Sequence, residues 1–341
     1  MLGSPLFGRL LKKVQMQGGA RDEARDVLTC TSQRRASKPT PQMGLFQQPA
    51  RFRLTVAAKQ SLFGYAILLP TLAIILIFRF LPMLQAFYIS LHEYDLIRPP
   101  RFIGLENFID LLQDPLFLHS ARISVAYVVF SCVPVWILAL ALAVLFNREI
   151  RAKNLFRSAA FMPVVMPAVV NAVVWTFMYH QDGVVNTILE WVGIDPIPWL
   201  RSSRWALWAI IIIGIWRATP YYMVIFLAGL QAIPNEYYEA AQIDGASPWG
   251  QFWHITLPLL RPTTLLVMVM SVIVAMKVFA VPLIMTGGGP ADATRVLPLF
   301  IYQTAFEFFK MGRAAAMSVF LFVAVMLFTL FQIRLFSRGE N

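Results

Sequence analysis

Residues 234–262 read PNEYYEAAQIDGASPWGQFWHITLPLLRP and form the longest polar interruption in the C-terminal half of the chain. Pro234 suits the first turn of a helix, and Gly245 can adopt the positive φ that closes one. Ser247 followed by Pro248 is typical of a second helix start, because serine caps free N–H groups and proline needs no donor there. The stretch therefore predicts a helix–turn–helix between two long apolar segments.

The composition of the whole chain indicates a membrane protein. Of its 341 residues, 58% are hydrophobic and only 14% are charged, and the mean hydropathy is +0.63. A soluble domain carries about 25% charged residues. Several apolar runs exceed the roughly 18 residues that mark a membrane-spanning helix. The composition thus excludes an ordinary soluble protein, and Cys30 and Cys132 alone indicate no disulfide framework.

Six apolar segments predict an all-α, polytopic membrane protein with six transmembrane helices. Their approximate bounds are 62–84, 123–146, 158–179, 205–230, 263–286 and 314–335. The chain then divides into a tail at 1–60, a membrane domain at 61–336 with a polar loop at 231–262, and a short tail at 337–341. Six prolines inside these segments are expected to bend the helices: Pro70, Pro134, Pro163, Pro167, Pro220 and Pro282.

The basic residues predict the orientation in the membrane. Eighteen Lys and Arg residues fall on the side of the N-terminal tail, against eight in the loops on the opposite side. Because loops rich in Lys and Arg stay in the cytoplasm, both termini and the loop at 231–262 are predicted to be cytoplasmic.

The tail at 1–60 is basic and lacks a sustained apolar period, so it is predicted to be mostly disordered. It is not a secretory signal, because no apolar core with a cleavage site follows its basic residues. Translation could start at Met1 or at Met43, and the stretch after Met43 is the more usual kind of beginning. The sequence leaves both starts open. The formal charge of +11 lies mainly in this tail and beside the spans. This placement favours contact with membrane lipid over binding of nucleic acid.

The polar loop carries a spaced pattern that resembles the permease subunits of binding-protein-dependent ABC importers. The pattern consists of Glu239-Ala240-Ala241, Gly245 and Ile255-Thr256-Leu257-Pro258. Two flanking runs resemble the carbohydrate-uptake branch, which includes the maltose and glycerol-3-phosphate transporters: Leu230-Gln231-Ala232-Ile233-Pro234 and Thr286-Gly287-Gly288-Gly289-Pro290. The resemblance covers roughly residues 62–336. The alternative interpretation is a loop that merely joins two helices.

The resemblance implies the type I ABC importer permease fold and a transport subunit that is not an enzyme and holds no cofactor. Two partner ATPase subunits would hydrolyse ATP, since the sequence has no Gly-x-x-x-x-Gly-Lys-Ser/Thr motif. A helix at 236–245 would couple to an ATPase through Glu239, Ala240, Ala241, Asp244, Gly245 and Pro258. The implied assembly adds a second permease subunit and a periplasmic or lipid-anchored solute-binding protein, in the inner membrane of a bacterium.

Two cations lie deep inside predicted spans. Arg217 is thirteen residues from the cytoplasmic end of 205–230, and Lys277 is fourteen from that of 263–286. At about 1.5 Å per residue, both lie about 20 Å into the membrane, where ionisable residues face a cavity or the bundle interior. The alternative is pairing with a partner subunit or with backbone carbonyls.

Two tyrosines complete the predicted substrate path of Arg217, Tyr221, Tyr222 and Lys277. Tyr221 lies one helical turn from Arg217 on the same face. It also resembles a tyrosine that lines the sugar site in the maltose relative. The sequence departs from that relative at two polar sugar contacts, which are here Ala275 and Val278.

The resemblance implies ATP-driven alternating access for a sugar or polyol, with glycerol-3-phosphate or a related phosphodiester as the alternative solute. An ion-coupled secondary transporter is a second hypothesis, but the predicted spans contain no Asp or Glu to bind a coupling ion. A membrane enzyme is a weaker one, because no nucleophile–base pair or metal set is visible. The four histidines have no metal-ligand spacing: His92, His119, His180 and His254.

Overall fold

The computed structural model describes residues 56–148 and 153–337. The chain divides into two compact units, 1–64 and 65–341. Only the beginning of α2 (Val56–Ile75) belongs to the described part of the first unit, so the fold is that of residues 65–341. The predicted disordered tail therefore falls almost wholly outside the described residues.

The second unit is built from helices, with one short strand pair in its described part. The first half contains η1 (Leu76–Phe80), α3 (Leu81–Ser90), β1 (His92–Glu93), β2 (Arg101–Phe102), α4 (Glu106–Gln113), α5 (Pro115–Asn147), α6 (Lys153–Val165), α7 (Ala168–Met178) and α8 (Val184–Trp191). The second half contains α9 (Ala206–Gln231), α10 (Glu236–Ile243), α11 (Pro248–Gln251), η2 (Phe252–Thr256), α12 (Leu257–Leu259), α13 (Arg261–Ala275), α14 (Ala280–Thr286), α15 (Leu297–Tyr302), η3 (Gln303–Glu307) and α16 (Met311–Ser337). The η segments are π-helical turns, and β1 pairs antiparallel with β2, His92 opposite Phe102.

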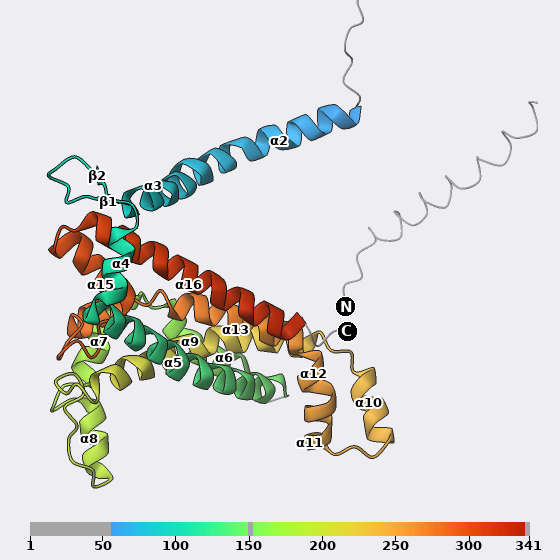
Figure 1. Ribbon diagram of the computed structural model, residues 1–341. Helices are drawn as coiled ribbons and strands as arrows, with labels where there is room; N and C mark the ends of the chain where they lie inside the picture. The colour runs from blue at the N-terminus through green and yellow to red at the C-terminus, as the bar shows by residue number, and fades with distance from the viewer. Residues whose placement is uncertain (1–55, 149–152, 338–341) are drawn as a thin grey trace, which may run out of the picture. The chain divides into compact units, whose positions relative to one another are not determined.

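The central contact of the fold joins α5 and α9, with α13 packed on both (Figure 1). On α5, Ala139 and Ala143 are fully buried one helical turn apart. Small residues at this spacing let membrane helices approach closely. The larger side chains of α9, among them Met223 and Phe226, fill the same cluster.

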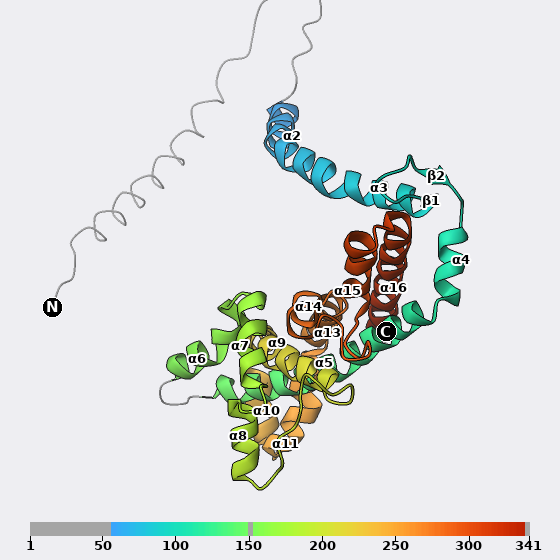
Figure 2. The same cartoon turned by 90° about the vertical axis from the view of Figure 1, so that its left-hand side faces the viewer.

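The C-terminal helix α16 forms the second packing centre, beside α3, α4 and α15 (Figure 2). Asp114 caps α5 by accepting a hydrogen bond from the Leu116 backbone N–H at 2.8 Å, and it also pairs with Arg313 of α16. Gly312 lies against the backbone of residues 92–94, and its N–H donates to the Tyr94 carbonyl at 3.1 Å. A side chain at Gly312 would overlap the His92 carbonyl oxygen.

Four of the predicted spans are confirmed as single helices long and apolar enough to cross a membrane. They are Ile67–Ser90, Pro115–Asn147, Ala206–Gln231 and Met311–Phe336. One bent pair, Arg157–Val165 with Ala168–Met178, covers the predicted span at 158–179. A second bent pair joins Pro248–Leu259 of the loop to Arg261–Ala275, so the described residues contain four spans, or up to six if each bent pair counts as one.

The predicted span at 158–179 is broken rather than continuous. Helices α6 and α7 meet at an angle of 103° around Pro167. Proline lacks the N–H that would bond to the carbonyl four residues earlier, and it disfavours helical backbone in the residue before it. The buried side chain of Asn171 replaces the lost donor, with its Nδ2 at 3.3 Å from the Pro163 carbonyl.

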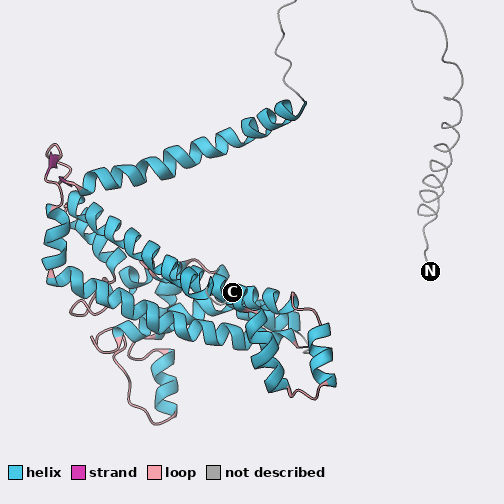
Figure 3. Cartoon of the chain, turned by 45° about the vertical axis from the view of Figure 1, so that its right-hand side comes forward, coloured by secondary structure: helices cyan, strands magenta, loops and turns pink. Residues whose placement is uncertain are grey.

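The predicted helix at 263–286 is wrong in its second half, because α13 ends at Ala275 and α14 begins at Ala280. Pro282 explains the interruption, since its ring would clash with the Val278 carbonyl in a continuous helix. At its other end, α13 continues the loop segment Pro248–Leu259 through a bend of 65° (Figure 3).

Candidate functional site

The loop at 231–262 forms a helix–turn–helix, as predicted. Its first arm is α10, which begins at Glu236, two residues later than the proline suggested. The Ala246 N–H donates to the Ala241 carbonyl at 2.8 Å, and the Gly245 N–H donates to the Gln242 carbonyl at 3.0 Å. This pair of bonds is the Schellman motif, and Gly245 supplies its positive φ of 78°.

The second arm runs through α11, η2 and α12 beside α10 (Figure 1). The Ser247 side chain caps α11 by accepting a hydrogen bond from the Gly250 N–H at 3.2 Å, which confirms the predicted cap. The two arms are joined by a 3.0 Å hydrogen bond between the hydroxyls of Tyr238 and Thr256. We call residues 234–262 the loop arm.

The two helices that flank the loop arm, α9 and α13, are in close contact where the loop arm begins and ends. A Cβ atom added to Gly229 of α9 would lie 2.5 Å from the Thr263 Oγ1 of α13. Leu260, just before α13, is fully buried in the hydrophobic cluster that also contains Leu230 and Ile233. The base of the loop arm is therefore closely packed against both α9 and α13.

The loop arm exposes an apolar surface instead of burying one. No residue of α10 is buried, and five large apolar side chains of the loop arm are exposed: Tyr237, Ile243, Trp249, Trp253 and Leu259. The predicted coupling residues share this surface. Glu239, Ala240, Asp244, Gly245 and Pro258 are exposed, and Ala241 is half-buried. Several exposed aromatic and aliphatic side chains on one short projection are typical of a protein-binding site.

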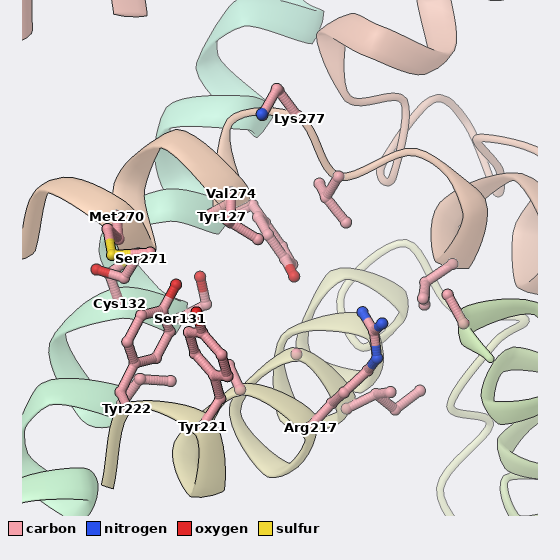
Figure 4. A pocket seen from close by; sticks show the side chains of 18 of the residues that line it. Tyr127, Ser131, Cys132, Arg217, Tyr221, Tyr222, Met270, Ser271, Val274 and Lys277 are labelled. Carbon is pink, nitrogen blue, oxygen red and sulfur yellow. The ribbon is translucent and has the colours of Figure 1, made fainter. Parts of the chain in front are cut away.

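A cavity of about 530 Å³ lies beside the middle of α9, against its residues 213–222. It is lined mainly by α5, α9, α13 and the segment between α13 and α14, with smaller contributions from α6, α7 and α14 (Figure 4). All four residues of the predicted substrate path line it: Arg217, Tyr221, Tyr222 and Lys277. Non-helical backbone at membrane depth is tolerated where it lines a cavity, which fits the interruption at residues 276–279.

The two cations that line this cavity differ in their local backbone, since one lies on a helix and the other in a non-helical segment. Arg217 lies on α9, and its Nε is buried without a hydrogen-bond partner among the described residues. Lys277 was expected on a continuous helix but lies in the non-helical segment after α13, where it is exposed. Tyr222 is buried, Tyr221 is exposed, and their rings meet edge to face at 5.2 Å between centroids.

The sequence reasoning missed the wall contributed by α5. Tyr127, Ser131 and Cys132 line the cavity opposite α9. The Tyr127 ring crosses to α9 over Gly214, where an added Cβ would lie 2.5 Å from the tyrosine oxygen. The spacing of Tyr127 and Ser131, one turn apart within an apolar span, could have revealed this polar face.

The cavity lining suits binding rather than chemistry. Its polar groups are hydroxyls, one thiol and the two cations, set among apolar and aromatic side chains. Among the described residues that line it, none is Asp or Glu. Aromatic walls with a few placed hydroxyl groups are typical of sites for small polar solutes.

Comparison with known proteins places this architecture in a family. Residues 121–339, which contain both the loop arm and every residue that lines the cavity, match the family described as binding-protein-dependent transport system inner membrane component. The chain belongs to this family. Its members are transport permeases, so the chain is a permease rather than an enzyme, as the resemblance implied.

Two curated relatives illustrate the range of this family. The trehalose/maltose transport system permease protein MalF of Thermococcus litoralis is 35% identical over 277 residues, covering 80% of this chain and 92% of the relative. The sn-glycerol-3-phosphate transport system permease protein UgpA of Agrobacterium fabrum is also 35% identical, covering 82% of this chain and 96% of the relative.

A solved structure confirms the fold. It is that of a bacterial alginate ABC transporter in complex with an alginate pentasaccharide-bound periplasmic protein. One of its chains matches with a TM-score of 0.74 at 24% identity, over 83% of this chain and 96% of that chain. The fold is therefore that of an ABC transporter permease, consistent with the predicted type I architecture.

Proposed function

We propose that this permease moves a sugar or polyol across the inner membrane of a bacterium by ATP-driven alternating access. The observation that carries the proposal is that the same two helices, α9 and α13, line the cavity and flank the loop arm. Helix α9 holds Arg217, Tyr221 and Tyr222 on the cavity and leads directly into α10. Helix α13 connects the second arm to the cavity wall in the same way.

The loop arm is the coupling element in this proposal. Its exposed Tyr237 and Ile243 and its acidic first turn would dock in a cleft on one of two ATPase subunits. When ATP draws the ATPases together, the contact between Gly229 and Thr263 would move α9 and α13 as one body. The predicted orientation puts this end of α9 and both termini in the cytoplasm.

A second permease subunit and a solute-binding protein complete the proposed transporter. The most apolar window of the span Ile67–Ser90 contains no buried residue, so lipid or another subunit must cover it. The binding protein, periplasmic or anchored to lipid, would deliver solute at the end of α9 opposite the loop arm. The family description and the alginate transporter complex support this partner.

Sugar is the preferred solute class because MalF is a trehalose/maltose permease and the cavity offers hydroxyls and aromatic rings. Glycerol-3-phosphate or a related phosphodiester is the second candidate. The similarity to UgpA and the two cations in the cavity favour it.

Charge reversal at Glu239 tests the coupling role. Glu239→Lys places a cation at the positive end of α10 and removes an acceptor for the ATPase, so uptake should fall about tenfold or more. The control is Glu190→Lys on α8, an equally exposed helical position at the opposite end of α9. The measurement is solute uptake and solute-stimulated ATP hydrolysis, normalised to assembled complex. Full coupled transport by Glu239→Lys would contradict the proposal.

A further inference from the structure

Two positive charges face the cavity without a negative partner in the described part of the chain. Neither Arg217 nor Lys277 forms an ion pair with a described residue. The lining residues include no carboxylate, as noted above, and the Arg217 Nε is buried and unbonded. A cation withdrawn from water is stabilised only when an opposite charge or several acceptors replace its hydration.

The hydroxyl groups of the cavity are gathered away from Arg217. Ser131, Tyr221 and Tyr222 lie together on one side, and the Arg217 guanidinium rises from the other (Figure 4). The Tyr127 hydroxyl reaches between the two groups from α5. The cavity thus presents a cationic end and a hydroxyl-rich end to whatever fills it.

We propose that the transported solute is a polyhydroxylated anion, with a carboxylate, phosphate or sulfonate directed at Arg217. Its hydroxyl groups would exchange hydrogen bonds with Tyr127, Ser131 and the paired tyrosines. Lys277, exposed at the edge of the cavity, would add positive potential that draws the anion inward. The inference rests on the proposed function, because it assumes that this cavity is the solute path.

The chemistry of arginine makes the charge of the solute decisive. The guanidinium group donates from a planar fork that matches two anionic oxygens at once. A neutral sugar can accept hydrogen bonds from this fork but leaves the positive charge of Arg217 uncompensated. An acidic solute brings the missing charge with it, and release follows when the cavity opens to water.

Uptake by the complete transporter with its binding protein tests the proposal. The anionic probes are labelled sn-glycerol-3-phosphate, glucuronate and a sulfonated hexose, and the neutral probes are maltose and glycerol. Wild type should take up an anionic probe. Arg217→Gln should reduce that uptake about tenfold or more, because a charged hydrogen bond is lost. Arg217→Lys should restore part of it.

The control is Arg201→Gln, which removes an exposed cation outside the cavity and should leave uptake unchanged. Uptake of neutral probes alone would overturn the inference and leave the proposed sugar permease standing. Uptake of no probe by an assembled transporter with active ATPases would overturn both. Failure of Arg217→Gln and Arg217→Met to assemble with the second permease would also overturn the inference, because the counter-charge would then belong to that subunit.

Discussion

Helices α8 and α10 lie at opposite ends of α9 and have the same length and the same kind of C-terminal end (Figure 1). Each has eight residues, and each ends in a Schellman motif around a glycine with positive φ, Gly193 for α8 and Gly245 for α10. In α8 the Ile194 N–H donates to the Leu189 carbonyl at 2.9 Å, the counterpart of the bond from Ala246 to Ala241. Both helices also expose large apolar side chains.

The difference lies in how each helix is attached. Asn186 of α8 is fully buried and forms five hydrogen bonds. They join it to the carbonyls of His180, Gln181 and Ile197, the Ile197 N–H and the indole of Trp199. No residue of α10 is fully buried, and its described sideways contacts are the hydrogen bond between Tyr238 and Thr256 and the packing of Tyr238 on the core. The described residues therefore anchor α8 within the fold and leave most of the α10 surface exposed, which is what the proposed coupling role requires.

The largest expected loss of stability comes from removing the buried hydrogen bonds that hold α8, which α10 lacks. Asn186→Leu strands several buried donors and acceptors, so it should destabilise the protein by about 3 kcal/mol or more. The matched control is Asn235→Leu at the start of α10, where the side chain makes no capping hydrogen bond. Thermal unfolding of the purified transporter should show a large fall for the first variant and almost none for the second. Equal shifts would mean that α8 is no better anchored than α10.

The second prediction separates backbone strain from function. Valine at either glycine must hold a left-handed backbone, which costs about 1–2 kcal/mol. Neither glycine has another atom within 4 Å of an added Cβ, so the strain is the same in both. Gly245→Val should abolish coupled uptake, whereas Gly193→Val should retain most of it. Comparable uptake by the two variants, per assembled complex, would show that the end of α10 has no special role.

Sequence reasoning succeeded where local rules decide the structure and failed where packing decides it. The cap at Ser247, the closing glycine at Gly245 and the four uninterrupted spans follow from neighbouring residues. The break before α14 also had a local cause in Pro282, but an apolar run hides where a helix stops. Lys277 was therefore placed on a helix that does not reach it.

The cavity could be predicted only in part. Charges inside apolar spans identified Arg217 and Lys277, because such residues rarely face lipid. The α5 wall escaped notice because Tyr127 and Ser131 are unremarkable in a membrane helix until α9 is packed against them. The close approach at Gly214 depends on a residue almost ninety positions away, which no local pattern records.

The smallest expected effect concerns the bond between the two arms. Tyr238→Phe removes the hydroxyl that meets Thr256, a hydrogen bond worth about 0.5–1.5 kcal/mol, so uptake should fall about two- to tenfold. Tyr88→Phe on α3 is the control, since that exposed side chain lies outside the loop arm and its hydroxyl has no hydrogen-bond partner among the described residues. Uptake assays on the two variants should differ by that factor. Equal uptake by Tyr238→Phe and Tyr88→Phe would show that the hydrogen bond between the two arms contributes nothing to coupling.

Protection of α10 by an ATPase is the most direct test of the coupling role. In a cysteine-free chain, a cysteine at Ile243, which is 88% exposed, should react readily with a water-soluble thiol reagent in the permease pair alone. Assembly with the ATPases should slow that reaction about tenfold or more, because the centre of an interface excludes water. A cysteine at Trp191 of α8 should react equally fast in both states. An unchanged rate at Ile243 would show that α10 is not the surface on which the ATPase docks.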